Sequence, residues 1–191
     1  MKHIRLLAAA AVLFCLCGSA GAQVVKTKTK VEGDEVKYKS KGFLYTFQEQ
    51  SKIYQPTYSA QFVPGNQAYA TQVLNAWKSY EANLLDLSPD FLADTVAAML
   101  PDGTVIKGKG AFVTAIKAYR SGFSAMKTTV EAWMPVKSID QNKESVCIWG
   151  IWNCTKTDGT KLKQAVHELW FFNSDGKVDY FRQFTQQLPN N

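Results

Sequence analysis

The sequence lacks the short motifs that mark several large enzyme classes. It contains no G-x-S-x-G, no glycine-rich phosphate loop and no C-x-x-C, the patterns typical of serine hydrolases, nucleotide-binding proteins and thiol redox enzymes. Histidine is also scarce: apart from His3 near the start of the chain, His167 is the only one. No second histidine lies at ligand spacing from it, so we expect no metal site and no cofactor.

No apolar run is long enough to span a membrane. The run LLAAAAVLFCLC follows Lys2 and Arg5 and falls well short of the ~20 apolar residues that a spanning helix needs. It is followed by Ala20, Gly21 and Ala22. A basic start, a short apolar run and small residues are typical of a secretory signal peptide. We expect residues 1–22 to be removed after Ala22 and the mature protein to be periplasmic or secreted.

Cysteine and excess charge are sparse in the remaining chain. Cys15 and Cys17 belong to the predicted leader, and Cys147 and Cys154 lie seven residues apart on one predicted strand. Seven strand steps separate them by ~20 Å, too far for a disulfide. Because the leader carries two basic residues, its removal lowers the formal net charge from +6 to +4. The basic residues do not gather on one helix face with aromatics, so we expect no nucleic-acid partner.

Lysines alternate with other residues at the start of the mature chain. In VVKTKTKVEGDEVKYKSKG the period of two predicts strands, and the acidic, glycine-containing centre Glu32–Glu35 predicts a turn. This hairpin has too few apolar residues for a core of its own. We therefore expect residues 23–65 to form a Lys-rich N-terminal arm and, from Phe43 to Pro64, a connector that packs on the domain.

Helices and strands of a second region, residues 66–188, follow from apolar spacing. Asn66 precedes Val73, Trp77, Tyr80 and Leu84, whose spacings of four, three and four predict a capped amphipathic helix. A second long helix is predicted over roughly Gly110–Gly122, and a short one from Ser88-Pro89-Asp90. The predicted strands are Thr95–Leu100, Thr104–Lys107, Lys127–Ile139, Ser145–Lys156, Lys161–Phe172 and Lys177–Thr185.

This order of elements predicts an α+β fold. A long antiparallel meander of this kind curls, and the apolar helices fill its concave side. We expect a curved antiparallel sheet wrapped over three helices, which is a cystatin-like cone. A cone of this kind has one open mouth, a usual site for a small ligand.

Two stretches carry a resemblance to a known family: LPDGTVIKGKGA and the turn Asp175–Val178. They resemble the SnoaL-like group of the nuclear transport factor 2-like superfamily, over about Asn66–Gln186. The resemblance implies the cone fold but no single activity, because this fold serves cyclases, isomerases, dehydratases and non-catalytic binding modules. Polyketide cyclases of the group pair a histidine with an aspartate. The matching positions here are Glu168, next to His167, and Gln183, whose carboxamide cannot act as a general base.

Strand alternation brings the candidate site residues together. If Trp170 points into the cone, Glu168 does as well, His167 faces the other side, and Gln183 lies within reach of Glu168. Burial beside Trp170 would disfavour the ionised form of Glu168 and prepare it for proton transfer; the alternative is a structural carboxylate bonded to Gln183 or Arg182. Glu168 is the candidate catalytic residue and His167 the alternative, and the candidate ligand-binding residues are Trp77, Tyr80, Met99, Trp170 and Gln183.

Three functions remain open from the sequence. The first is an exported protein that binds a small apolar or amphipathic molecule without turnover. The second is a cofactor-independent isomerase, dehydratase or cyclase that uses Glu168 as its acid or base. The third is an association module that forms a homodimer through an outer sheet face, on which Trp149 or Trp152 is exposed.

Overall fold

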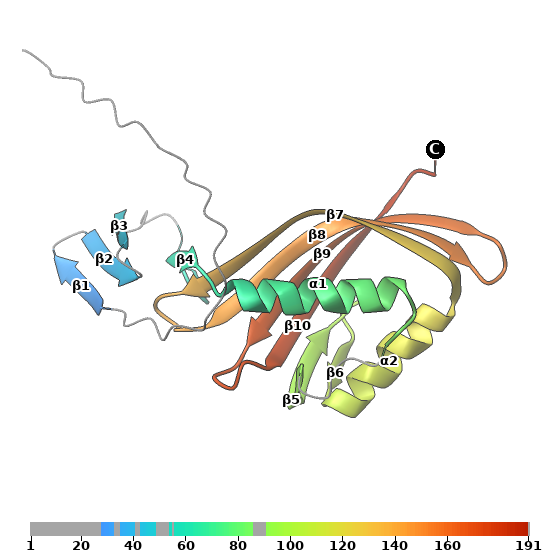
Figure 1. The fold of residues 1–191 in the computed structure, drawn as a ribbon, viewed down its shortest axis with the longest axis horizontal. Coiled ribbons are helices and arrows are strands. Elements are labelled where there is room, and N and C mark those ends of the chain that lie inside the picture. Colours follow the sequence, from blue (N-terminus) through green and yellow to red (C-terminus); the bar gives the residue numbers. More distant parts are fainter. Residues whose placement is uncertain are drawn as a thin grey trace, which may run out of the picture. The chain divides into compact units, whose positions relative to one another are not determined.

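The computed structural model describes residues 28–32, 35–40, 43–48, 54, 56–85 and 91–190 (Figure 1). The predicted leader, residues 1–22, lies outside these ranges. The chain divides into two compact units, Met1–Glu49 and Gln50–Asn191, and each is considered by itself. Neither helix in the described ranges is long and apolar enough to cross a membrane.

The first unit contains a three-stranded antiparallel sheet in the order β1-β2-β3. Its strands are β1 (Lys28–Glu32), β2 (Glu35–Ser40) and β3 (Phe43–Gln48). Glu32 pairs with Glu35 across the predicted turn, which confirms the hairpin. The connector prediction is wrong for Phe43–Gln48, because this aromatic-rich segment, FLYTFQ, pairs with β2 as a third strand.

The second unit is built on a seven-stranded sheet in the order β4-β7-β8-β9-β10-β5-β6. Neighbouring strands are antiparallel except β10 and β5, which are parallel. Phe62–Pro64, at the end of the predicted connector, is also a strand of this sheet. The bounds are β4 (Phe62–Pro64), β5 (Leu92–Met99), β6 (Val105–Lys107), β7 (Phe123–Ser138), β8 (Glu144–Lys156), β9 (Lys161–Phe172) and β10 (Val178–Leu188).

The described part of the second unit contains two helices, α1 (Gln67–Glu81) and α2 (Lys109–Ser121). The Asn66 side chain caps α1 by accepting a hydrogen bond of 3.0 Å from the Ala68 N–H, as predicted. The start of the predicted third helix, Ser88-Pro89-Asp90, lies outside the described residues. Its continuation is strand instead, because Leu92–Asp94 already belongs to β5.

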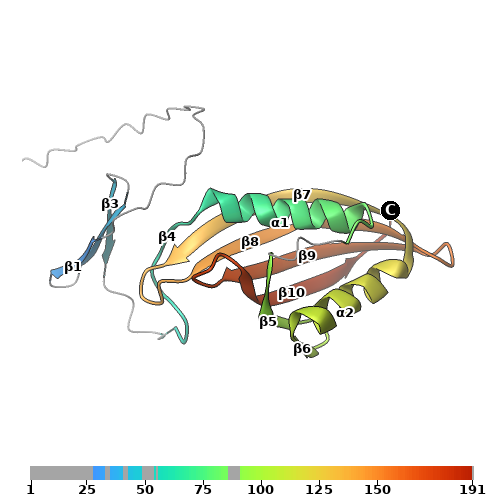
Figure 2. The ribbon, with the colours of Figure 1, turned by 60° about the horizontal axis from the view of Figure 1, so that its bottom comes forward.

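Both helices pack against one face of the curved, unclosed sheet, which we call the inner face. α1 runs along the sheet, and the C-terminal end of α2 lies near the C-terminal end of α1 (Figures 1 and 2). Trp77 of α1 and Phe112 of α2 are buried in one core cluster with inner-face residues such as Ile148 and Phe172. The fold is therefore the predicted α+β cone.

A bulge helps to bend the sheet between β7 and β8. The register of β7 shifts between Val130 and Ala132, and Val130 pairs with Gly150 of β8. A Cβ atom at Gly150 would lie 2.2 Å from the Thr129 carbonyl oxygen, so only glycine permits this close approach. Bulges of this kind increase local bending and twist, and this one lies in the long strands that form the cone wall.

Candidate functional site

A cavity of about 300 Å³ opens among α1, α2 and the inner face of the sheet. Its wall is mostly apolar, and its polar side chains include Asp102, Glu168, Gln183 and Thr185. The remaining wall is dominated by seven aromatic residues: Trp77, Tyr80, Phe112, Tyr119, Trp152, Trp170 and Phe181. A mainly aromatic cavity with few polar groups is typical of a small-molecule site.

Glu168 is fixed in this cavity by three N–H donors. The Gln183 amide donates to one carboxylate oxygen at 2.7 Å, and the indole N–H groups of Trp170 and Trp77 donate to the other at 3.0 Å and 2.5 Å. Glu168 and Gln183 are direct partners in the β9–β10 register. The contact between them is the one that strand alternation predicts, whereas the donation from Trp77 of α1 was not predicted. Only 3% of Glu168 is exposed.

The surroundings of Glu168 make its protonation sensitive to pH near neutrality. Burial raises the pKa of Glu168 to about 7, and the weaker opposing effects are the hydrogen bonds from Gln183, Trp77 and Trp170. Both protonation states are therefore populated at neutral pH. Such a carboxyl group can accept a hydrogen bond from a ligand or exchange a proton with it.

Tyr80 adds a phenolic hydroxyl group to the cavity wall. Burial raises the pKa of Tyr80 far above its ordinary value, so its hydroxyl group stays protonated at neutral pH. This hydroxyl makes no hydrogen bond with any residue in the described ranges. Trp152 stacks on the Tyr80 ring with 5.2 Å between ring centroids. Stacking on Trp152 therefore holds the Tyr80 ring in place, and its hydroxyl group has no hydrogen-bond partner among the described residues.

Two predicted site residues lie away from the cavity. Met99 is half-buried and is not part of the cavity wall, because its neighbour Ala98 takes the fully buried position on β5. His167 is exposed on the outer face, the face opposite the helices, between Trp149 and Phe184. Met99, which was predicted to contact the ligand, therefore lies outside the cavity wall, and His167 cannot replace Glu168 in the cavity.

Other expected contacts also differ. Arg182 does not bond to Glu168; it is exposed, and its guanidinium group lies 4.7 Å from the Phe184 ring centroid on the outer face. Trp152 is buried in the cavity wall, whereas Trp149 is half-buried on the outer face. The two cysteines follow the same alternation: Cys154 is buried, Cys147 is half-buried, and both are free thiols.

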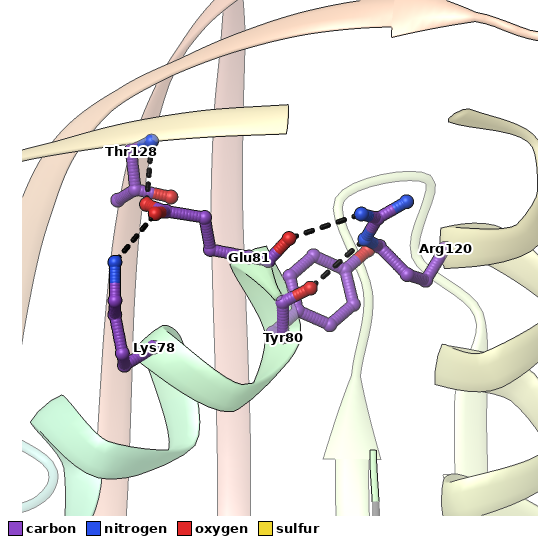
Figure 3. Close-up of polar contacts among 5 residues, drawn as sticks. All are labelled: Lys78, Tyr80, Glu81, Arg120 and Thr128. Carbon is purple, nitrogen blue, oxygen red and sulfur yellow. Dashed lines mark hydrogen bonds and ion pairs between the residues drawn. The ribbon is translucent and has the colours of Figure 1, made fainter. Parts of the chain in front are cut away.

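Arg120 is a buried side chain that the sequence analysis missed (Figure 3). It donates to the carbonyl oxygens of Tyr80 at 2.9 Å, Glu81 at 3.0 Å and Phe123 at 2.8 Å. Carbonyl groups at a helix C-terminus lack partners within the helix and favour a cation. Arg120 thereby holds the end of α1, including Tyr80 of the cavity wall, against α2 and the start of β7.

The same corner contains a second link between α1 and β7. The Glu81 carboxylate accepts a hydrogen bond of 2.9 Å from the Thr128 N–H and a 2.7 Å contact from the Lys78 ammonium group (Figure 3). The hydrogen bond with Lys78 is the main reason that the pKa of Glu81 is lowered. Arg120 and Glu81 thus both anchor the C-terminal end of α1, where the cavity wall begins.

Comparisons with known protein structures establish the fold of this chain. No protein-family model matches the sequence, and a search of curated proteins gives no match. A structure of an NTF2-like protein of unknown function from Burkholderia pseudomallei K96243 is similar, with a TM-score of 0.51 and 15% identity over 62% of this chain and 90% of that chain. The Orange Carotenoid Protein of Anabaena (Nostoc) sp. PCC 7120 binding canthaxanthin is also similar, with a TM-score of 0.50 and 16% identity.

The second match covers 69% of this chain and 40% of the carotenoid protein. Identities this low establish the fold alone. The protein therefore has the nuclear transport factor 2-like fold, and the resemblance found in the sequence is confirmed at that level.

Proposed function

We propose that this protein binds a small apolar or amphipathic molecule in the cavity, without turnover, and that Glu168 anchors the polar part of the ligand. The observation that carries the proposal is a cavity with mainly aromatic walls in which one carboxyl group is held by three N–H donors. Gln183 directly opposite Glu168 supports binding over catalysis, because a carboxamide cannot take up a proton as a general base does.

The polar groups suggest how such a ligand is oriented. Its apolar body would contact aromatic rings such as Phe112 and Phe181, which lie in the wall with 5.3 Å between ring centroids. Its polar end would meet the Glu168 carboxyl group and the hydroxyl group of Tyr80. Loss of the anchor in Glu168→Leu should weaken binding by ~1–3 kcal/mol, the usual cost of leaving buried polar groups without partners.

Native mass spectrometry tests this proposal. The mature protein is incubated with a lipid and metabolite extract, and mass-shifted species are sought. Ala115→Trp should abolish them because Ala115 lines the cavity, whereas Ala118→Trp is a matched control because Ala118 is exposed on the same helix. Protein that stays empty in every sample, or equal loading of both variants, would contradict the proposal.

A second candidate function is a cofactor-independent isomerase, dehydratase or cyclase. The pKa of Glu168, raised by burial to about 7, favours it, because a general acid or base works best near the ambient pH. Tyr80 or Gln183 would supply a hydrogen bond to the developing charge. The test is a pH-rate profile for any compound that the extract experiment recovers. Glu168→Gln should remove the inflection near neutrality, and absence of product with wild-type protein would argue against catalysis.

A third candidate is a homodimer formed through the outer face of the sheet. Trp149 is half-buried there, Met134 is 48% exposed and Phe184 is 42% exposed, and apolar side chains gathered on an open face favour association. Light scattering over a range of concentrations tests it. A molecular mass that stays that of one chain at high concentration would count against the dimer.

We also propose that the protein is exported and that its signal peptide is cleaved after Ala22. The basic residues Lys2 and Arg5, the short apolar run and the small residues before Gln23 support this. Cell fractionation followed by peptide mass spectrometry should find a mature N-terminus at Gln23 in the periplasmic or secreted fraction. Full-length chain in the cytoplasm would contradict it.

A further inference from the structure

The cavity has an unusual charge content for a basic protein. Its described wall contains two carboxyl groups, Glu168 on β9 and Asp102 in the turn between β5 and β6, and no lysine, arginine or histidine. The chain as a whole has a formal net charge of +6. A cavity that gathers acidic groups while the rest of the chain is basic attracts cations and repels anions.

Glu168 has hydrogen-bond donors but no counter-charge. All three groups that donate to it, the amide of Gln183 and the indoles of Trp77 and Trp170, are neutral. The buried cation nearby, Arg120, directs its guanidinium group to backbone carbonyl oxygens. An ionised Glu168 is therefore a negative charge in an apolar cavity without a cation beside it, and such a charge is costly unless a ligand compensates it.

The aromatic walls suit the same kind of ligand. An indole N–H lies in the plane of its ring, so Glu168 occupies the edges of Trp77 and Trp170 and leaves the ring faces to other groups. Ammonium groups bind over the faces of Trp, Tyr and Phe, and desolvated aromatic cages bind quaternary ammonium ligands. A carboxylate among aromatic rings combines the two interactions that such a cation uses.

We infer that the ligand of this cavity is an organic cation, an ammonium group carried on a small apolar body, which places its charge among the aromatic rings beside Glu168. This inference rests on the proposed binding function and names its ligand class. Asp102, exposed at the turn, adds a second negative charge on the same cavity. A neutral ligand would gain only a hydrogen bond from these carboxyl groups, and an anionic ligand would be repelled by them.

Binding of a cation is coupled to proton release from Glu168. An adjacent positive charge favours the ionised carboxylate, so affinity should rise as the pH increases through the pKa of about 7. The other ionisable groups near the cavity are Tyr80 of α1, Tyr119 and Arg120 of α2, Cys154 of β8 and Asp102 of the β5–β6 turn. They do not reproduce this rise of affinity with pH. Burial raises the pKa values of the two tyrosine hydroxyls and of the thiol, a hydrogen bond from a backbone N–H lowers the pKa of Asp102, and arginine stays charged.

The test compares choline with 3,3-dimethylbutan-1-ol, the uncharged molecule of the same shape, by titration calorimetry or ligand-detected NMR. At pH 8.5 choline should bind the mature protein about tenfold more tightly than the alcohol. At pH 5.5 its affinity should fall by roughly tenfold, while that of the alcohol stays within about threefold, because only the cation needs the ionised carboxylate.

Variants separate Glu168 from the net charge of the protein. Glu168→Gln should abolish the preference for choline, whereas Glu131→Gln, an exposed position on β7, should keep it. Asp102 is exposed, and Asp102→Asn removes its charge while keeping the shape of the side chain. This variant should reduce choline affinity by about twofold. His167→Asn removes the histidine on the opposite face of β9 and should leave the pH dependence in place.

Each outcome decides the inference. Equal affinities for choline and the alcohol at pH 8.5 would contradict the inference that the ligand is a cation, but would leave the proposed binding function intact. Binding of neither probe also overturns the cation, and the proposed function then depends on the extract experiment with Ala115→Trp and Ala118→Trp. If Glu168→Gln still prefers choline, the cation binds at another surface, and Glu168 is not the group that binds it.

Discussion

Two buried ionisable side chains are held in this fold in opposite ways. Glu168 is 3% exposed and accepts hydrogen bonds from three side-chain N–H groups. Arg120 is 5% exposed and donates to three backbone carbonyl oxygens. Neither has a partner of opposite charge within hydrogen-bond distance in the described part of the chain. Only Glu168 lines the cavity.

The difference teaches which buried charge is structural. Arginine keeps its proton under all ordinary conditions, and the carbonyl groups at the end of α1 give its charge a permanent partner. A carboxyl group can give up its charge, so burial of Glu168 shifts its protonation instead of locking it. Arg120 therefore acts as a fixed clamp, and Glu168 as a group whose state a ligand or the pH can change.

The largest expected effect is the loss of the clamp. Arg120→Met removes the guanidinium donor from three carbonyl groups, of which that of Tyr80 also accepts a hydrogen bond from the Asn83 N–H at 3.1 Å. The substitution should lower the free energy of unfolding by about 3–5 kcal/mol. Because arginine does not titrate, the loss should be equal at pH 5.5 and 8.5 in urea denaturation. Arg182→Met, which removes an exposed arginine of β10, is the control and should cost under ~1 kcal/mol. Similar losses for the two variants would contradict the clamp.

Glu168→Gln should have a smaller effect that depends on pH. The pKa of Glu168 in the folded protein, about 7, lies above its ordinary value of 4.5, so folding favours the protonated form. That stabilisation is complete below pH 4.5 and is lost as the pH rises through 7. Relative to wild type, the variant should gain up to about 3 kcal/mol between these limits.

Urea denaturation at pH 4.5, 6 and 8 measures this gain. Glu131→Gln, on the exposed part of β7, should show a constant difference from wild type over the same range. A constant difference for Glu168→Gln as well would mean that Glu168 is not desolvated.

The smallest effect is expected at Glu81, the carboxylate beside the clamp. Its pKa is lowered, first of all by the hydrogen bond from Lys78, so it stabilises the fold above its unfolded pKa and loses this effect as the pH falls. Glu81→Gln should cost about 0.5–1 kcal/mol at pH 7, and the cost should shrink as the pH falls below 4.5. A pH trend of the same sign as that of Glu168 would break the contrast between the two carboxylates.

The sequence predicts that Glu168 and Gln183 meet in the site, because the alternation of side chains along a strand depends only on neighbouring residues. Trp170 and Phe172, two positions apart, set the inner face of β9, and the Asn173–Gly176 turn together with the register shift between Val178 and Tyr180 pairs Glu168 with Gln183. Helix spacing likewise places Trp77 on the apolar face of its helix, and Trp77 is buried in the structure.

Long-range geometry explains what the sequence does not predict. Which acceptor the indole N–H of the buried Trp77 reaches depends on how α1 packs across the sheet, because Glu168 lies 91 residues away in the sequence. Met99 was misplaced because the parallel pairing of β5 with β10 leaves no trace in either strand. Arg120 had a usable signal, since it lies four residues after Ile116 and eight after Phe112 on the apolar face of α2.

The most direct test of the central claim is the titration of Glu168 itself. Carbon-detected NMR of the mature protein would follow the side-chain carboxyl carbon from pH 3 to 10, and the resonance missing in Glu168→Gln assigns it. Our account predicts a midpoint at about pH 7, the mark of a buried carboxyl group without a counter-charge. A midpoint near the ordinary value of 4.5 would contradict it.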